Sequence, residues 1–299
     1  MTLAVTPPRA LTMRSRSRGR MTTWLLLAPM SLWFALLLIA PLIVVVVFSV
    51  GERSHAGGYQ PAFTFDQYAN LATRATAFAN TLQVTFLGTV ICMLVAYPLA
   101  YYLAIFAGRR KTILLILVVV PFWTSMLIRS YAWMTILGSN GVPAFLQSMG
   151  IAEDLVLLNT PFAVTLGLVY NYLSLMVLPI YVALERMDKR LIEAAKDLGS
   201  GSVQAFLQVT APLTAPGVVT GGMLVFIFMA GDYVIPALLG GNRVFLVSNA
   251  LVDLFLQSQN WPFGAALAVA LTVIMLGLVG IYLKLTRRLN AEPADVSLL

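Results

Sequence analysis

The sequence predicts an all-α membrane protein with six transmembrane helices. Of its 299 residues, 60% are hydrophobic and 10% are charged, whereas a soluble domain carries roughly 25% charged residues. Charge-free apolar stretches recur along the chain, and each is close to or above the ~20 residues that a helix needs to cross a hydrocarbon core about 30 Å thick. The stretches show no alternation of polar and apolar residues, which disfavours membrane-spanning strands.

Each of the six stretches is expected to form one helix. The first follows a run of arginines, but its apolar part is longer than the ~7–15 residues of a signal-peptide core, so we expect it to be retained. Several prolines lie inside the stretches and predict kinks, namely Pro29, Pro41, Pro98, Pro121 and Pro179. The expected helices cover residues 23–50, 80–106, 112–137, 160–184, 216–239 and 263–283.

Lysines and arginines are distributed unequally among the connecting segments. The segments before the first helix, between helices two and three, between four and five, and after helix six hold 15 of them, against three in the other loops. Because cytoplasmic loops carry the excess of basic residues, both termini are expected in the cytoplasm. The chain then divides into a basic cytoplasmic tail in contact with anionic lipid (1–22), a first helix (23–50), an external loop (51–79), a core with five helices (80–285) and a second cytoplasmic tail (286–299).

The composition also disfavours several classes of function. Cys92 and His55 are the single residues of their types, so neither an intrachain disulfide nor a cysteine–histidine metal cluster is expected. The basic residues form short runs without interleaved aromatics, so nucleic acid is not an expected partner. No cluster with catalytic spacing and no G-x-x-x-x-G-K-[ST] phosphate loop occurs. We therefore expect no catalytic residue, no metal site and no cofactor in this chain.

The segment between expected helices four and five carries the most specific pattern. Asp188 is placed to cap a short helix, and Gly199 can take the left-handed conformation that ends it. Ser202 is placed to cap a second short helix before Pro212. Two short amphipathic helices on the cytoplasmic side suit docking into a groove of a soluble partner. Their apolar residues are Leu191, Ala194, Ala195, Leu198, Val203, Phe206 and Leu207.

The spacing of this segment resembles the EAA loop of type I ABC importer permeases. Glu193, Ala194 and Ala195 are followed after three residues by Gly199, and nine residues later by the segment 209–212. One departure is Ala211, where the family usually has Leu. The segments 97–102 (YPLAYY), 121–133 (PFWTSMLIRSYAW) and 231–241 (GDYVIPALLGG) are similar to the first permease subunit of spermidine/putrescine importers.

This resemblance implies a fold, a set of partners and a mechanism. The fold is that of a type I ABC importer permease, with the two short helices acting as coupling helices. The implied partners are a second, different permease subunit that forms a heterodimer with this chain, two ATPase subunits that bind ATP and Mg, and an external substrate-binding protein. The implied location of this chain is the prokaryotic inner membrane. ATP-driven closure of the ATPase pair would turn the cavity outward. The residues implied in ATPase coupling are Glu193, Ala194, Ala195, Leu198, Gly199, Phe206 and Pro212.

Two ionisable residues fall inside expected helices, Arg129 and Asp232. Such residues are costly in a membrane and are functional by default. Asp232 could meet a cationic substrate, while aromatic faces nearby could make cation–π contacts. Alternatively, Arg129 and Asp232 pair with each other or snorkel, and the aromatics belong to the interfacial belt. The aromatic candidates for the substrate pathway are Trp123, Tyr131, Trp133 and Tyr233.

The function expected from these features is that of a permease subunit of an ATP-driven importer for a polyamine or a similar small cation. A self-sufficient secondary transporter is the alternative, although internal repeats, which are frequent in that class, are not detected. A membrane-embedded enzyme is a third class, without a catalytic cluster to support it. Gly217 and Gly221 have the spacing that permits close packing of membrane helices.

Overall fold

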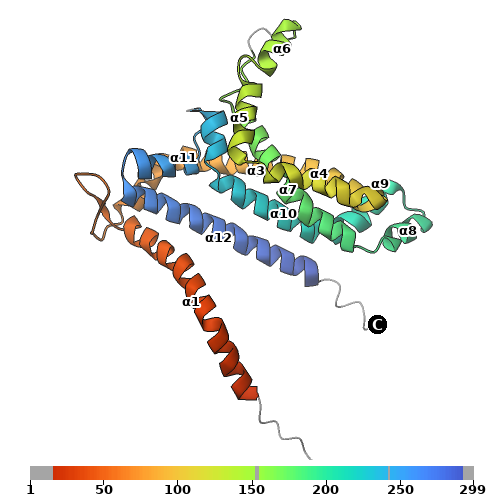
Figure 1. Cartoon of the computed structure of the whole chain (residues 1–299), viewed down its shortest axis with the longest axis horizontal. Helices are drawn as coiled ribbons and strands as arrows, with labels where there is room; N and C mark the ends of the chain where they lie inside the picture. The colour runs from red at the N-terminus through yellow and green to blue at the C-terminus, as the bar shows by residue number, and fades with distance from the viewer. Residues whose placement is uncertain (1–15, 152–154, 242, 292–299) are drawn as a thin grey trace, which may run out of the picture.

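The computed structural model describes residues 16–151, 155–241 and 243–291, and these residues are mostly helical (Figure 1). Within them, five helices are long and apolar enough to cross a membrane, or six when one bent pair is counted as a single span. The chain therefore has the multi-helix membrane architecture that its hydropathy predicts. The first and last residues, 1–15 and 292–299, fall within the two expected tails and lie outside the described part.

Helix α1 (Arg16–Ser49) begins earlier than the expected residue 23 and diverges from the other helices (Figure 1). Between Leu26 and Ser49, its most apolar 18-residue window buries none of its residues in the chain. Its end is anchored where the Phe48 ring stacks on Tyr59 at 4.4 Å and on Trp261 at 6.1 Å between centroids. The expected external loop contains the antiparallel strands β1 (Glu52–Arg53) and β2 (Tyr59–Gln60), followed by α2 (Asp66–Ala69) and η1 (Asn70–Arg74).

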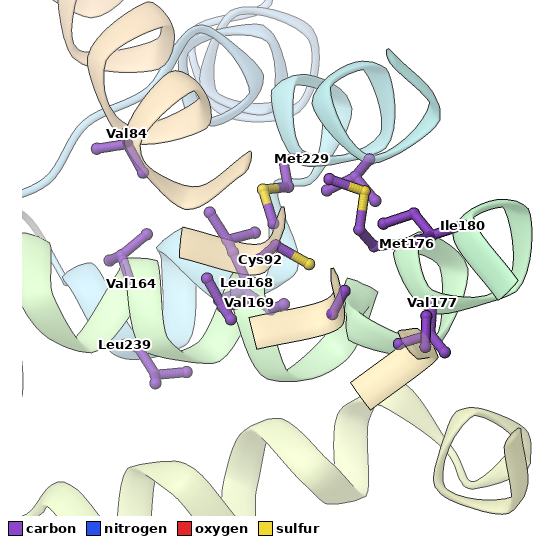
Figure 2. Packing of buried hydrophobic residues seen from close by; sticks show 14 of the residues in the cluster. Val84, Cys92, Val164, Leu168, Val169, Met176, Val177, Ile180, Met229 and Leu239 are labelled. Carbon is purple, nitrogen blue, oxygen red and sulfur yellow. The ribbon is translucent and has the colours of Figure 1, made fainter. Parts of the chain in front are cut away.

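The centre of the bundle is formed by α3 (Ala75–Tyr101), α7 (Pro161–Arg186) and α10 (Ala211–Gly231). Figure 2 shows their shared core, in which Cys92, Leu168 and Met229 come from three different helices. Small residues on α3, including Ala96 and Ala100, are fully buried there. Small side chains let helix backbones approach closely, which is how helices associate in a membrane.

The expected helix over residues 112–137 is broken into two helices shortly after Pro121, where the sequence predicts a kink. Helix α4 (Lys111–Trp123) and the segment from Met126 onward are bent by 87°. Pro121 cannot donate a backbone hydrogen bond, and Thr124 and Ser125 take extended conformations. The Thr124 hydroxyl donates to the Pro121 carbonyl at 2.7 Å. The second part, α5 (Met126–Leu137) with α6 (Val142–Ser148), projects away from the bundle (Figure 1).

The expected helix over residues 216–239 differs at both ends. It starts earlier, because α9 (Ser202–Ala205) and the π-turn η4 (Phe206–Thr210) run without a break into α10. It also ends earlier, because Asp232 is extended and a separate turn, η5 (Pro236–Gly240), follows. The remaining elements are η2 (Tyr102–Phe106) and η3 (Gly108–Arg110) before α4, and α11 (Val247–Val252), η6 (Asp253–Gln257) and α12 (Trp261–Ala291) at the end of the chain.

Candidate functional site

The first short helix of the expected coupling segment is α8 (Arg190–Asp197), which lies with α9 at one end of the bundle (Figure 1). Lys189 takes the N-cap position, and the Asp188 carboxylate, one residue earlier than expected for a cap, accepts a hydrogen bond from the Arg190 amide at 3.0 Å. Gly199 has φ +90°, and the amide of Ser200 donates to the Ala195 carbonyl at 3.0 Å. This 6→1 bond after a left-handed residue is a Schellman motif, so the predicted helix stop is confirmed.

Most of the residues expected to contact an ATPase are exposed. Glu193 and Ala194 are exposed and Ala195 is half-buried. Leu198, directly after the helix, is 88% exposed. Contiguous apolar patches that a chain leaves exposed are typical of interaction sites. The large apolar side chains that are exposed in this segment are Leu191, Leu198, Val203 and Leu207.

The second short helix, α9, is not an independent element, and the expectation that Ser202 caps it is wrong. Gly201 takes the N-cap position, and its carbonyl accepts from the Ala205 amide at 2.9 Å. Phe206 is half-buried, and its ring lies perpendicular to those of Tyr97, at 5.5 Å between centroids, and Tyr101, at 5.9 Å. Because α9 and η4 continue into α10, a displacement of α9 would be transmitted directly to the transmembrane helix.

Several contacts that tie this segment to the rest of the bundle are not apparent from sequence spacing. The Tyr97 and Thr214 hydroxyls lie 2.8 Å apart and join α3 to α10. The Lys189 ammonium donates to the Ala104 carbonyl at 2.8 Å, which joins the start of α8 to η2. Lys111 and Glu185 form an ion pair at 2.6 Å between α4 and α7. From the sequence, Lys111 and Lys189 predicted only which loops face the cytoplasm.

Asp232 lies in the extended residue between α10 and the next turn, and is 6% exposed. One carboxylate oxygen, Oδ1, accepts from the backbone amides of Val234 at 2.9 Å and Ile235 at 3.3 Å. The other, Oδ2, accepts from the Tyr172 hydroxyl at 3.0 Å. The described residues contain one ion pair, Lys111–Glu185, so the alternative in which Asp232 pairs with Arg129 does not hold in this conformation.

Two neighbouring cavities open where α5, α7 and α10 meet. The first has a volume of about 380 Å³ and includes Arg129 and Asn171 in its lining. The second, of about 330 Å³, is lined by Asp232 and Tyr233. The two share the lining residues Met126, Tyr172 and Phe228. Arg129 and Asp232 therefore line two neighbouring cavities that have these three residues in common.

The other aromatic candidates lie apart from Asp232. Trp123 lines an apolar cavity between α4 and α7 and is 80% exposed. The Trp133 ring packs edge-on against that of Tyr170, with 5.4 Å between the ring centroids. Tyr131 is exposed on α5. Only Tyr233 of the four aromatic candidates lines a cavity with Asp232. Three residues that line these cavities were not expected from the sequence, namely Tyr172, Asn171 and Phe228. For the first two, a polar group within an apolar helix is the signal that could have found them.

The comparison with protein families identifies residues 96–290 as a binding-protein-dependent transport system inner membrane component. This match covers more than half of the chain, including the exposed turn at Gly199 and the cavities around Tyr172. The chain belongs to this permease family. The permease is thus a multi-pass inner-membrane protein, and the alternative of a self-sufficient secondary transporter is wrong.

Similar proteins with curated names agree with this family. The spermidine/putrescine transport system permease protein PotB of Haemophilus influenzae is 39% identical over 264 residues, which is 87% of this chain and 92% of that protein. The protein of the same name from Escherichia coli is 34% identical, over 87% of this chain and 96% of its own length. The inner membrane ABC transporter permease protein YdcU of E. coli is 30% identical, over 90% of each chain.

Solved structures show the same fold. A bacterial alginate ABC transporter in complex with an alginate-bound periplasmic protein contains a chain that matches with a TM-score of 0.73 at 17% identity, over 93% of this chain and 98% of that one. A second structure of an alginate importer matches with a TM-score of 0.70 at 18% identity, over 91% of this chain and 96% of that one. The permease is a membrane subunit and not itself the ATPase, so an ATPase and a binding protein are its partners.

Proposed function

We propose that this permease forms part of the translocation pathway for a polyamine, such as spermidine or putrescine, or a similar small cation. The names of its PotB relatives support this substrate class. The observation that carries the proposal is Asp232, a buried carboxylate that lines a cavity and has no ion-pair partner among the described residues. A carboxylate in a membrane protein that lacks a cationic partner is suited to bind a cationic ligand.

Coupling to ATP is proposed to act through α8 and the exposed turn at Gly199. The exposed residues Glu193, Ala194 and Leu198 would contact an ATPase subunit, which binds ATP and Mg. Pro212, also exposed, lies in the first turn of α10, where the motion enters the transmembrane helix. A rigid-body rotation of α8 and α9 would thus tilt α10 and change access to the cavities at its other end.

A second, non-identical permease subunit is proposed to complete the pathway. The helices α1 and α12 bury few or none of the residues in their most apolar segments within this chain. The cavities at Asp232 and Arg129 are open to the surface of this subunit, so another subunit is needed to enclose a substrate. A heterodimer is the form expected from the resemblance to importers with a distinct first permease subunit.

Both termini and α8 are proposed to face the cytoplasm, as the distribution of basic residues requires. A single cysteine introduced at Ser202 should react with a membrane-impermeant thiol reagent only from the cytoplasmic side, and one at Ser54 only from outside. These labels are read in intact cells and in inverted vesicles, after Cys92→Ser removes the native thiol. Labelling of position 202 from outside would contradict this orientation.

Loss of the Asp232 charge should lower uptake. Asp232→Asn retains an oxygen that can accept from the Val234 and Ile235 amides, while the Tyr172 hydroxyl can accept from the new amide group. The complex should therefore assemble, and putrescine uptake should fall by at least about tenfold, because a buried charge-assisted contact contributes more than ~1.4 kcal/mol.

The matched control is Asp253→Asn, which removes the same charge from the turn η6, away from the lining of both cavities. Its uptake should equal that of the unmodified complex. Uptake and the amount of assembled complex are measured together in both variants. Full putrescine uptake by Asp232→Asn would remove Asp232 from the pathway.

A further inference from the structure

The cavity next to Asp232 contains two buried polar atoms that have no hydrogen-bond partner among the described residues. One is a donor, Nε of Arg129, and the other is an acceptor, Oδ1 of Asn171. Asn171 is 3% exposed, and its amide nitrogen donates to the Gly167 carbonyl at 2.8 Å. That bond fixes the orientation of the amide group, so the oxygen is the atom left free. Buried polar atoms without a partner are rare and need an explanation.

A cationic side chain in this position is also unusual. Arg129 lies in α5, shortly after the bend at Thr124 and Ser125, and no carboxylate of the described residues lies within ion-pair distance of it. Two acceptors line the cavities around it. Asn171 lines the same cavity as Arg129, and Asp232 lines the adjoining one, with Met126, Tyr172 and Phe228 common to both.

We propose that Arg129 is a two-position cation that competes with the transported amine for Asp232. In a second conformation of the substrate-free transporter, different from the one described here, it pairs with Asp232; when an ammonium group of the substrate occupies Asp232, the guanidinium turns to the free oxygen of Asn171. The first cavity, of about 380 Å³, provides the space for this long side chain to change direction. In the conformation described here neither contact is made.

This role makes Arg129 a specificity-determining residue, and the inference rests on the proposed import of amines. An amine must displace a guanidinium to reach Asp232, so ligands without a strong positive charge are rejected. Return of Arg129 to Asp232 also helps to expel the substrate. An ammonium group and a guanidinium cannot both occupy the carboxylate without like-charge repulsion at short range.

Uptake kinetics separate this role from a purely structural one, because two substitutions should shift the half-saturating putrescine concentration in opposite directions. Arg129→Gln removes the competitor, so this concentration should fall about five- to tenfold while the maximal rate also falls. Asn171→Leu removes the alternative acceptor and holds Arg129 on Asp232, so the concentration should rise. In the double variant the effect of Asn171→Leu should disappear, because it acts only through Arg129.

A further variant serves as the control for Arg129→Gln. Arg243→Gln removes an equivalent charge from an exposed position that lines neither cavity, and should change neither parameter. Loss of uptake in Arg129→Gln at an unchanged half-saturating concentration would assign Arg129 a structural role and overturn the proposal.

A second measurement tests the pairing without any transport. Thermal unfolding of the assembled complex is compared for Arg129→Gln, Asp232→Asn and their combination, first without ligand and then with saturating putrescine. We expect coupling between the two substitutions without ligand and its loss with putrescine. Absence of coupling in the ligand-free complex overturns the proposal. If the two substitutions are coupled but the unmodified complex does not import putrescine, the proposed substrate class is refuted and the pairing stands.

Discussion

Replacement of Gly199 by valine is expected to abolish transport while the permease remains inserted and assembled. Gly199 has φ +90°, a conformation that costs a residue with a side chain about 1–2 kcal/mol and a β-branched one more. A Cβ atom at this position would meet no atom within 4 Å, so the effect would come from the backbone alone. The turn would relax to another conformation and change the angle between α8 and α9.

The substitution should affect the coupling of transport to ATP hydrolysis and not the stability of the complex. Substrate uptake and substrate-stimulated ATP hydrolysis by the complex are both expected to fall to background, because α9 continues into α10 and would no longer follow α8. Gly201→Val is the matched control, since Gly201 also has open space around it but has φ −65°, which valine tolerates. If Gly199→Val transports as fast as Gly201→Val, the turn has no role as a lever.

Replacement of Gly217 by alanine is expected to destabilise the bundle strongly. A Cβ atom there would lie 2.7 Å from the Pro179 carbonyl oxygen and closer still to the Ala183 methyl group, both on α7. Neither the carbonyl nor a methyl group can move away without shifting a helix. Overpacking of this kind costs typically 1–3 kcal/mol, so the thermal midpoint and the yield of assembled complex should both fall.

Gly222→Ala provides the comparison, five residues further along α10. A Cβ atom at Gly222 would meet the Met176 methyl group at 3.8 Å, which is ordinary contact. The two variants have the same effect on helix propensity, so a difference between them reports the contact with α7 alone. Equal thermal midpoints for the two variants would show that α7 and α10 do not pack closely at Gly217 in the assembled transporter.

The sequence alone was sufficient for features that depend on local chemistry. Long apolar stretches predicted the membrane helices because each must satisfy its own backbone hydrogen bonds in lipid. Asp188 and Gly199 predicted the bounds of α8 because capping and a left-handed glycine involve only a few neighbouring residues. The spacing around Gly199 also indicated the permease family, which the match over residues 96–290 confirms.

Tertiary structure decided the features that depend on which helix faces meet. Asp232 was expected inside a helix, yet it lies in an extended residue held by Tyr172, which is 60 residues away in the chain. Pro121 signalled a kink, but an 87° bend that places Arg129 beside Asn171 depends on how α5 packs against α7 and η5. Phe206 was expected to contact a partner, and its edge contacts with Tyr97 and Tyr101 of α3 are visible only in the packed bundle. Hydropathy is the same for a side chain that faces lipid, a partner or another helix, so only the packed bundle distinguishes these environments.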